Sequence, residues 1–289
     1  MNSRTGIIGG SGLYHIEGIK DLKEVRVRTP FGDPSSVFMT GLVEGAEVVF
    51  LARHDKGHRL LPSEINYRAN IYGMKKLGVE RIISISACGS LKEELKPLDI
   101  VIPDQFVDRT NYGRKMTFFG SGVVAHIQFA DPVCPELSKV LYETGIKAGA
   151  AMHLGGSYLN MEGPQFSTKA ESYLYRSWGM DIIGMTNLAE AKLAREAEIC
   201  YATLACITDY DCWHADQSTE HVSVEMIINN LCKNVDVSKK IVKSALPLLK
   251  KERSCVCADA LKDAIVTRPE AIPAKTKKDL GLIIGKYIK

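Results

Sequence analysis

Short apolar runs alternate with amphipathic stretches along most of the chain. Runs such as TGIIGG, AEVVFLAR, RIISISACGS and CYATLACIT are rich in apolar and β-branched residues and end in glycine or polar residues. Such runs are typical of strands in a buried sheet, and apolar residues three and four positions apart predict helices between them. The alternation predicts one three-layer α/β domain, in which helices flank a central sheet that is mostly parallel or mixed.

The same pattern predicts where individual elements begin and end. In the stretch 62–78, we expect Ser63 to be the N-cap of a helix that stops at Gly78. Further helices are expected in PELSKVLYETGIKAG, in KAESYLYRSWG and in NLAEAKLAREAEI, where Asn187 and Glu190 have the spacing of a capping box. DIVIPDQFVDRT is expected to form one strand followed by a polar loop.

The last part of the chain differs from the rest. The main domain is expected to cover residues 1–257. Residues 258–289 contain TRPEAIPAKTKKDLGLIIGKYIK, in which prolines punctuate a stretch that ends in apolar residues. We expect this segment to be an extension that packs on the main domain or on a neighbouring subunit.

Composition narrows the classes of partner. The 289 residues include 37 Lys and Arg against 34 Asp and Glu, and a net charge of +3 is too small to indicate a nucleic-acid or membrane binder. The first residues lack the apolar core of a signal peptide, and no run approaches membrane-spanning length. We therefore expect a cytoplasmic protein without nucleic-acid or membrane partners.

The eight cysteines do not show the paired CxxC spacing of a zinc site, so no metal site is expected. Buried free thiols are the simplest interpretation of most of them. Cys255 and Cys257, in SCVCAD, are one residue apart and could close only a small, strained ring.

Several predicted strand ends carry groups that suit an anion. Glycines bring backbone N–H groups close to a ligand, arginine offers a two-pronged donor, and a helix N-terminus attracts negative charge. Each segment also has a simpler interpretation, a tight turn for GGSG and a solvated basic loop for RHDKGHR. Phosphate is the natural ligand if the segments meet. The candidates are Ser11 in GGSG, Arg53 and His54 in RHDKGHR, Ser86 and Ala87 in SACGS, and Thr186 in MTNLAE.

Two acidic residues follow the apolar run ICYATLACI, in the segment TDYDCWH. Asp209 and Asp211 would lie on the same side of an extended chain. Crowded into a dry pocket, one carboxyl would have a raised pKa and could donate a proton to N7 of adenine, while the other accepts from the amino group. The alternative is an Asx turn that caps the strand.

Two apolar features admit two interpretations each. STEHVSVEMIINNL places Val224, Ile227 and Ile228 on one helix face, which is usually core but could line a pocket for an apolar substituent. Phe166, in GPQFS, could stack on a ring or belong to the core.

Together these motifs closely resemble the trimeric purine nucleoside phosphorylase superfamily, and within it the S-methyl-5′-thioadenosine phosphorylases. The resemblance runs from Gly6 to about Leu231 and is carried by GIIGGSGLY, LARHDKGH, SACGSL, MEGPQFST, MTNLAEAKLAREAEICYA and TDYDCW in this order. The CxC motif resembles one of some thermophilic members in which the cysteines are paired, so a Cys255–Cys257 bridge and two free thiols both stay open.

The resemblance implies roles for individual residues. Asp209 and Asp211 correspond to the pair that binds adenine, with Asp209 as the proton donor to N7. Three further groups are implied: a phosphate site of Ser11, Arg53, His54, Ser86, Ala87 and Thr186; a base and ribose site of Phe166, Ser167 and Met185; and an apolar pocket for a 5′-methylthio group, formed by Val224, Ile227 and Ile228 with His126 from a neighbouring subunit.

The implied activity is the cleavage of S-methyl-5′-thioadenosine by phosphate, giving adenine and 5-methylthioribose 1-phosphate, as in purine and methionine salvage. Inorganic phosphate is the co-substrate, no other cofactor is expected, and the assembly is a homotrimer or a hexamer of two trimers. A purine nucleoside phosphorylase for inosine, guanosine or adenosine is the main alternative. Asp209 and Val224 argue against 6-oxopurine nucleosides, because relatives that use them carry asparagine and histidine there. A nucleoside-binding protein and a hydrolytic nucleosidase are further alternatives.

Overall fold

The computed structural model describes residues 3–10, 17–111, 113–216, 224–250 and 252–288, with the backbone alone at 215, 216, 224, 226 and 227. The strands are β1 (Arg4–Gly9), β2 (Lys20–Val25), β3 (Phe38–Val43), β4 (Ala46–Ala52), β5 (Val79–Ser90), β6 (Ile100–Ile102), β7 (Gln105–Arg109), β8 (Met152–Leu154), β9 (Ser157–Met161), β10 (Ile182–Gly184) and β11 (Cys200–Asp209). The helices are α1 (Tyr67–Lys76), α2 (Pro135–Lys147), α3 (Lys169–Ser177), α4 (Asn187–Glu196), α5 (Val224–Ala245) and α6 (Ala274–Ile284), with short turns η2 (Cys212–Asp216), η3 (Leu246–Leu248), η4 (Val256–Asp259) and η5 (Pro269–Ala271).

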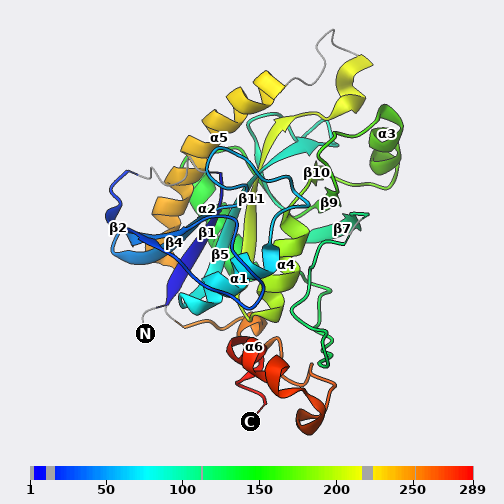
Figure 1. Ribbon diagram of the computed structural model, residues 1–289. Helices are drawn as coiled ribbons and strands as arrows, with labels where there is room; N and C mark the ends of the chain where they lie inside the picture. Colours follow the sequence, from blue (N-terminus) through cyan, green and yellow to red (C-terminus); the bar gives the residue numbers. More distant parts are fainter. Residues whose placement is uncertain (1–2, 11–16, 112, 217–223, 251, 289) are drawn as a thin grey trace.

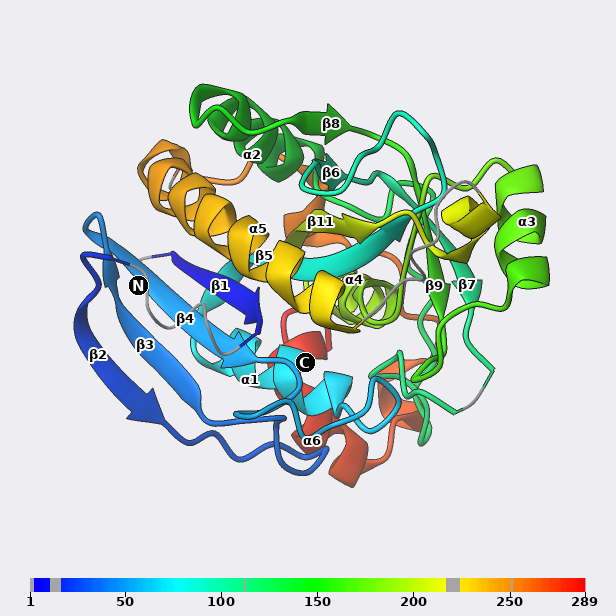
Figure 2. The same cartoon turned by 90° about the horizontal axis from the view of Figure 1, so that it is seen from above.

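The strands of the described residues form one mixed sheet whose centre is parallel. Strands β4, β1, β5 and β11 are neighbours in this order and run parallel, whereas β2, β3 and β6 pair antiparallel at the margins. Apolar residues along the central strands alternate between two cores, so that Ile7 and Phe50 face α2 and α5, and Ile8 and Leu51 face α1, α4 and α6. Figures 1 and 2 show α2 and α5 on one side of the central strands and α1 and α6 on the other. The predicted three-layer α/β architecture is confirmed.

Strand β5 has three neighbours because it is longer than any single partner. Along one edge it pairs with β11 from Arg81 to Gly89. Along the other edge, β1 pairs with β5 only as far as Ser84, and β10 pairs with Gly89 and Ser90. Among the described pairings, residues 85–88 therefore have no strand partner on this second edge. We call this stretch the β5 gap, and its backbone groups must be satisfied by side chains, water or a ligand.

Some predicted boundaries are wrong for physical reasons. Helix α1 is capped by Asn66, whose side chain accepts the N–H of Ala69 at 3.2 Å, not by Ser63, which lies in a turn before the helix. As predicted, helix α1 ends before Gly78, which has a positive φ of 80°. DIVIPDQFVDRT forms two strands rather than one, because Pro103 and Asp104 separate β6, which pairs with β11 and β8, from β7, which pairs with β9.

The described part of the C-terminal extension packs on its own chain. The hydroxyl of Thr276 donates to the Ser121 carbonyl at 2.7 Å, and the Tyr287 hydroxyl donates to Glu198 at 2.5 Å. Leu280 and Ile283 of α6 join the core beneath α1 and α4. The domain boundary at residue 257 stays a prediction. None of the helices in the described part of the chain has the length and apolar character needed to span a bilayer.

Two glycines predict opposite effects of one substitution. A Cβ atom at Gly73 in α1 would lie 2.4 Å from the ring of Phe38, whereas one at Gly281 in α6 would meet nothing within 4 Å. We expect Gly73→Ala to lower the free energy of unfolding by about 1–3 kcal/mol through overpacking. Gly281→Ala should raise it by up to about 1 kcal/mol. Denaturant unfolding at one protein concentration measures both, and equal changes would contradict the packing of α1 on β3.

Candidate active site

Arg53 lies at one end of the β5 gap. It follows β4, and its guanidinium donates to the Ile85 carbonyl at 3.1 Å and to the Ser84 hydroxyl at 2.5 Å. Glu190 in α4 receives two further bonds, at 2.5 and 3.2 Å. Burial would lower the pKa of Arg53, but the charge and hydrogen bonds of Glu190 outweigh it and raise this pKa above its ordinary value. The buried ion pair therefore joins β4, β5 and α4 and keeps the Arg53 guanidinium charged beside the gap, while the pair as a whole is neutral.

His54, beside Arg53, is held neutral. Burial and the charge of Arg53 lower the pKa of His54 from 6.5 to about 4. Its Nδ1 lies 2.8 Å from the Leu60 carbonyl, which requires a proton on Nδ1 and leaves Nε2 as an acceptor. The next residues of RHDKGHR, from Lys56 to Arg59, are exposed. The predicted anion site and the alternative of a solvated basic loop thus each describe part of this segment.

The N-terminus of helix α4 also lies beside the gap, where the Asn187 amide donates to the Ser84 hydroxyl at 3.1 Å. Thr186 is its N-cap and is buried, but its side chain makes no capping hydrogen bond. The predicted capping box of Asn187 and Glu190 is wrong. Asn187 is the first residue of the helix, and its amide donates to Tyr201 and Thr203 in the core. Neither side chain caps the N-terminus of α4, although the Leu188 N–H donates to the Asn160 side chain at 3.2 Å.

Five of the predicted phosphate ligands thus lie in a region that the structure describes. Arg53 and His54 follow β4, Ser86 and Ala87 lie within the β5 gap, and Thr186 follows β10, which borders it. Ser11 lies outside the described residues. The arrangement offers backbone N–H groups, a helix N-terminus and a fixed positive charge at one place, which is the chemistry of an oxyanion site.

The two acidic residues are buried beside the end of the gap. The Asp209 carboxylate accepts the Thr208 hydroxyl at 2.7 Å and the Asp211 N–H at 2.8 Å. Burial raises the pKa of Asp209, and the nearby charge of Asp211 adds to the effect. Asp211 accepts the Ser172 hydroxyl at 2.6 Å, and its pKa is also raised by burial. The predicted raised pKa is supported, with burial rather than crowding as its main cause.

The backbone around the acidic pair is a turn rather than the extended chain that we expected. Asp211 has a positive φ of 53°, and the bond from its N–H to Asp209 is that of an Asx turn. The alternative interpretation therefore describes the backbone correctly. Because both carboxyls are buried, the turn also confines two groups that resist ionisation.

Gly89 connects the gap with the acidic pair. It pairs with Ile183 on one side and with Asp209 on the other. A Cβ atom at Gly89 would lie 3.1 Å from the Asp209 carboxylate and 3.5 Å from Cβ of Asp211. The glycine of SACGS thus leaves the space that the acidic side chains occupy.

Arg114 is a buried residue of this region that the sequence analysis missed. Its guanidinium bonds to Glu162 at 3.1 Å and to the Met185 carbonyl. Gly163, with φ 70°, packs on the other side of Met185, where a Cβ atom would lie 2.5 Å from the sulfur. These contacts fix Met185, the predicted ribose contact, next to Thr186. A lone arginine in a loop gives no sequence signal of such a role.

The predicted wall of the base pocket lies beside Asp211. Burial raises the pKa of Asp211 and the Ser167 hydroxyl opposes this rise, while the Ser167 carbonyl accepts from Sγ of Cys212 at 3.3 Å. Phe166 is 52% exposed, so it is not a core residue. Ser172, which holds Asp211, was not predicted, although its place in the first turn of α3 after the Thr168 capping box is a recognisable position.

Helix α5 is fastened beside the acidic pair. Asn230 donates to the Thr208 carbonyl at 2.8 Å, and Asn234 donates to the Ile207 carbonyl at 3.0 Å. These asparagines, four residues apart on an otherwise apolar face, were an available but unused signal. Ile228 is 52% exposed. The side chains of Val224 and Ile227 lie outside the described part of the chain.

His126 is not joined to this site by any contact within the described chain. It is exposed, and its N–H donates to the Ala264 carbonyl of the C-terminal extension at 2.9 Å. That His126 contributes to the pocket of a neighbouring subunit stays a prediction.

Comparison with known proteins decides the family. The sequence model of the "Phosphorylase superfamily" matches residues 4–247. The chain belongs to the phosphorylase superfamily. It is 60% identical over 288 residues to S-methyl-5′-thioadenosine phosphorylase of Geobacter sulfurreducens, with 100% of both chains covered. It is 58% identical to the protein of the same name from Koribacter versatilis, covering 99% of this chain and 97% of that protein.

Solved structures of the phosphorylase superfamily share the fold. A methylthioadenosine phosphorylase from an Antarctic soil metagenomic library has a TM-score of 0.92 and 49% identity, and covers 98% of this chain and 99% of its own. A variant adenosine/methylthioadenosine phosphorylase from Schistosoma mansoni, in complex with methylthioadenosine, has a TM-score of 0.83 and 36% identity, with 90% of this chain and 96% of its own covered. The predicted superfamily and fold are confirmed.

The neutral state of His54 predicts a pH dependence of stability. Its folded pKa of about 4 lies below the ordinary value of 6.5, so the unfolded chain binds a proton first and stability falls as pH drops through this window. His54→Asn keeps a donor for the Leu60 carbonyl but cannot be protonated. Relative to this variant, we expect the wild type to lose up to about 3 kcal/mol between pH 6.5 and 4. Urea unfolding in this range measures it, and a difference independent of pH would contradict the assignment.

Proposed function

We propose that this protein cleaves S-methyl-5′-thioadenosine with inorganic phosphate, giving adenine and 5-methylthioribose 1-phosphate. The observation that carries the proposal is the buried pair Asp209 and Asp211 beside the β5 gap. The relatives that match the whole chain bear the name of this activity.

Asp209 and Asp211 hydrogen-bond the edge of the purine that carries N7 and the 6-amino group. A carboxyl that stays protonated near neutral pH donates to N7, while its neighbour accepts from the 6-amino group. Burial raises the pKa of both carboxyls, which favours a protonated carboxyl in this pair, and the resemblance assigns that role to Asp209. As the bond between N9 and C1′ lengthens, the proton at N7 offsets the negative charge that develops on the leaving adenine.

Phosphate binds in the β5 gap and attacks C1′ from the face opposite the base. Arg53 and the N-terminus of α4 supply positive potential, and the backbone of Ser86 and Ala87 supplies hydrogen bonds. Neutral His54 presents Nε2 as an acceptor, which suits a phosphate that still carries a proton. Ser11 completes the set from the loop after β1. Positioning and charge stabilisation account for the acceleration.

The resemblance assigns the 5′-methylthio group to an apolar pocket of Val224, Ile227 and Ile228, of which the structure describes only the side chain of Ile228. A hydroxyl buried there would lose its hydrogen bonds with water at a cost of about 1–3 kcal/mol. The pocket therefore favours a methylthio nucleoside over adenosine. Met185 lies under the ribose, and Phe166 with Ser167 closes the base side. The exposure of Ile228 and Phe166 in the free chain is consistent with surfaces that a ligand or subunit covers.

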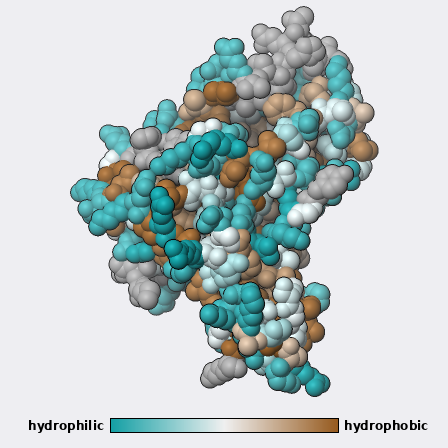
Figure 3. Space-filling view, viewed as in Figure 1, coloured by the Kyte–Doolittle hydropathy of each residue, from teal (hydrophilic) through white to brown (hydrophobic). Residues whose placement is uncertain are grey.

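The working enzyme is a cytoplasmic homotrimer in which His126 of one subunit completes the pocket of the next. Exposed apolar side chains support such assembly, because large apolar groups gather around α3. They are Phe166, Tyr173, Leu174 and Trp178. Figure 3 shows apolar side chains exposed on the α3 side of the molecule, at the right of the view. No cofactor beyond phosphate is proposed for the reaction.

Adenine release from S-methyl-5′-thioadenosine, followed with and without phosphate, tests the proposal. We expect release that depends on phosphate and gives one equivalent of 5-methylthioribose 1-phosphate, because phosphate is the nucleophile. Sulfate at equal ionic strength is the control, since it can occupy an oxyanion site but gives no stable sugar ester. Release without phosphate would indicate a hydrolytic nucleosidase. Absence of release would indicate a nucleoside-binding protein, and faster cleavage of inosine would indicate a purine nucleoside phosphorylase.

A further inference from the structure

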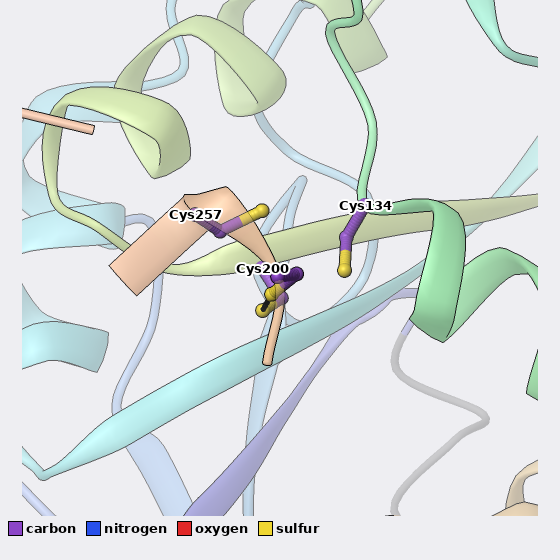
Figure 4. A group of neighbouring side chains, drawn as sticks. Cys134, Cys200 and Cys257 are labelled. Carbon is purple, nitrogen blue, oxygen red and sulfur yellow. Dashed lines mark hydrogen bonds between the residues drawn. The ribbon is translucent and has the colours of Figure 1, made fainter. Parts of the chain in front are cut away.

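Four cysteines that are far apart in the sequence meet in the fold. The sulfur atoms of Cys134, Cys200, Cys255 and Cys257 all lie within 4.8 Å of one another. Figure 4 shows the Cys134 and Cys257 side chains reaching toward the space beside Cys200 from separate segments of the chain. All four carry free thiols. We call them the four-cysteine cluster.

The backbone holds the ligand-bearing segments in place. Cys134 is the N-cap of α2, and its N–H donates to the Tyr201 carbonyl at 2.8 Å, next to Cys200 at the start of β11. The CxC segment after α5 is fastened by Arg253, which donates to the Glu198 carbonyl at 2.6 Å. The cluster is therefore built by ordered backbone rather than by chance contact of mobile side chains.

The spacing of the sulfur atoms suits a tetrahedral metal site. Zinc bound to four thiolates at about 2.3 Å requires sulfur atoms about 3.8 Å apart. Sγ of Cys200 and Sγ of Cys255 are 3.3 Å apart, and no pair in the cluster exceeds 4.8 Å. Shifts of a few tenths of an ångström to about 1 Å in side-chain position would complete the tetrahedron.

The surroundings suit thiolate ligands. Cys134, Cys200 and Cys257 are buried, and Cys255 is partly exposed, which leaves a path for an ion. Cys134 is the N-cap of α2, so the positive end of the helix dipole lies beside the cluster.

We propose that the four-cysteine cluster binds one zinc ion. Each thiol releases its proton to water, and the resulting site carries two negative charges in excess. Two arginines lie on the flanking segments: Arg81 pairs with Cys200 across the β5–β11 ladder, and Arg253 stands two residues before Cys255. The ion would join α2, β11 and the start of the C-terminal extension.

The site is structural and separate from the proposed active site. Strand β11 begins at Cys200 and ends at Asp209, so about 30 Å of strand separates the cluster from the acidic pair. Sequence spacing predicted no metal site because the ligands come from three distant segments. Disulfides among the same cysteines are the competing chemistry, and the experiment is designed to detect them.

The test uses full-length protein that has been reduced, stripped with a chelator and given zinc. We expect one zinc per chain after gel filtration, and cobalt in place of zinc should show thiolate charge-transfer and tetrahedral absorption bands. Cys134→Ser and Cys257→Ser should each retain at least tenfold less zinc at a limiting concentration. Cys232→Ser, which removes an exposed cysteine outside the cluster, is the matched control and should bind like wild type.

Zinc should also raise the unfolding temperature of wild type and Cys232→Ser, but not of Cys257→Ser. Wild-type protein that binds no more zinc than Cys134→Ser, or that gives no cobalt bands, would overturn the proposal even if a variant fails to fold. Loss of cluster thiols to disulfides in the purified protein, with no zinc uptake after reduction, would also overturn it. Adenine release by wild type is measured separately, so a failure to bind zinc does not bear on the proposed function.

Discussion

The unequal lengths of the partners of β5 shape the whole site. Because β1 leaves one edge of β5 at Ser84 and β10 joins that edge only at Gly89, residues 85–88 have no strand partner on that edge among the described pairings. Ligands in α/β sheets bind where neighbouring connections part, and here the parting lies along an edge of β5. Arg53 and the N-terminus of α4 border the gap, and Asp209 and Asp211 lie at its end. Strand β5 therefore sets the distance between the predicted anion site and the acidic pair.

Burial affects the charges of Arg53 and of the acidic pair in opposite ways. Arg53 keeps its charge because Glu190 pairs with it in the core, whereas Asp209 and Asp211 form no ion pair with a lysine or arginine in the part of the chain that the structure describes, and they resist ionisation. A fixed positive charge suits a bound anion, and a neutral carboxyl suits a leaving group that needs a proton. The same physical cost of burying charge therefore pairs Arg53 with Glu190 at one place and disfavours the ionised form of Asp209 and Asp211 at another.

The sequence predicted the layers, the main elements and most of the candidate residues, because apolar periodicity and strand-end glycines report local structure. It could not predict the β5 gap, which depends on the register of three strands, or the role of Arg114, which depends on a loop folding back over Met185. Asn187 was misassigned because its amide is used in the core rather than at a helix end. The four-cysteine cluster was not predicted because it also depends on the tertiary fold, which alone brings Cys134 close to Cys257.

The most direct test of the central claim is the substrate preference of Asp209→Asn. An amide cannot protonate N7 of adenine, but it can donate to the carbonyl of a 6-oxopurine. We predict a fall of about 100-fold or more in kcat/KM for S-methyl-5′-thioadenosine, with a much smaller change for its 6-oxo counterpart, S-methyl-5′-thioinosine. Asp236→Asn, an exposed site paired with Lys239, should leave both unchanged. Equal losses on the two substrates in Asp209→Asn would contradict the assignment of Asp209 as the acid that reads the purine.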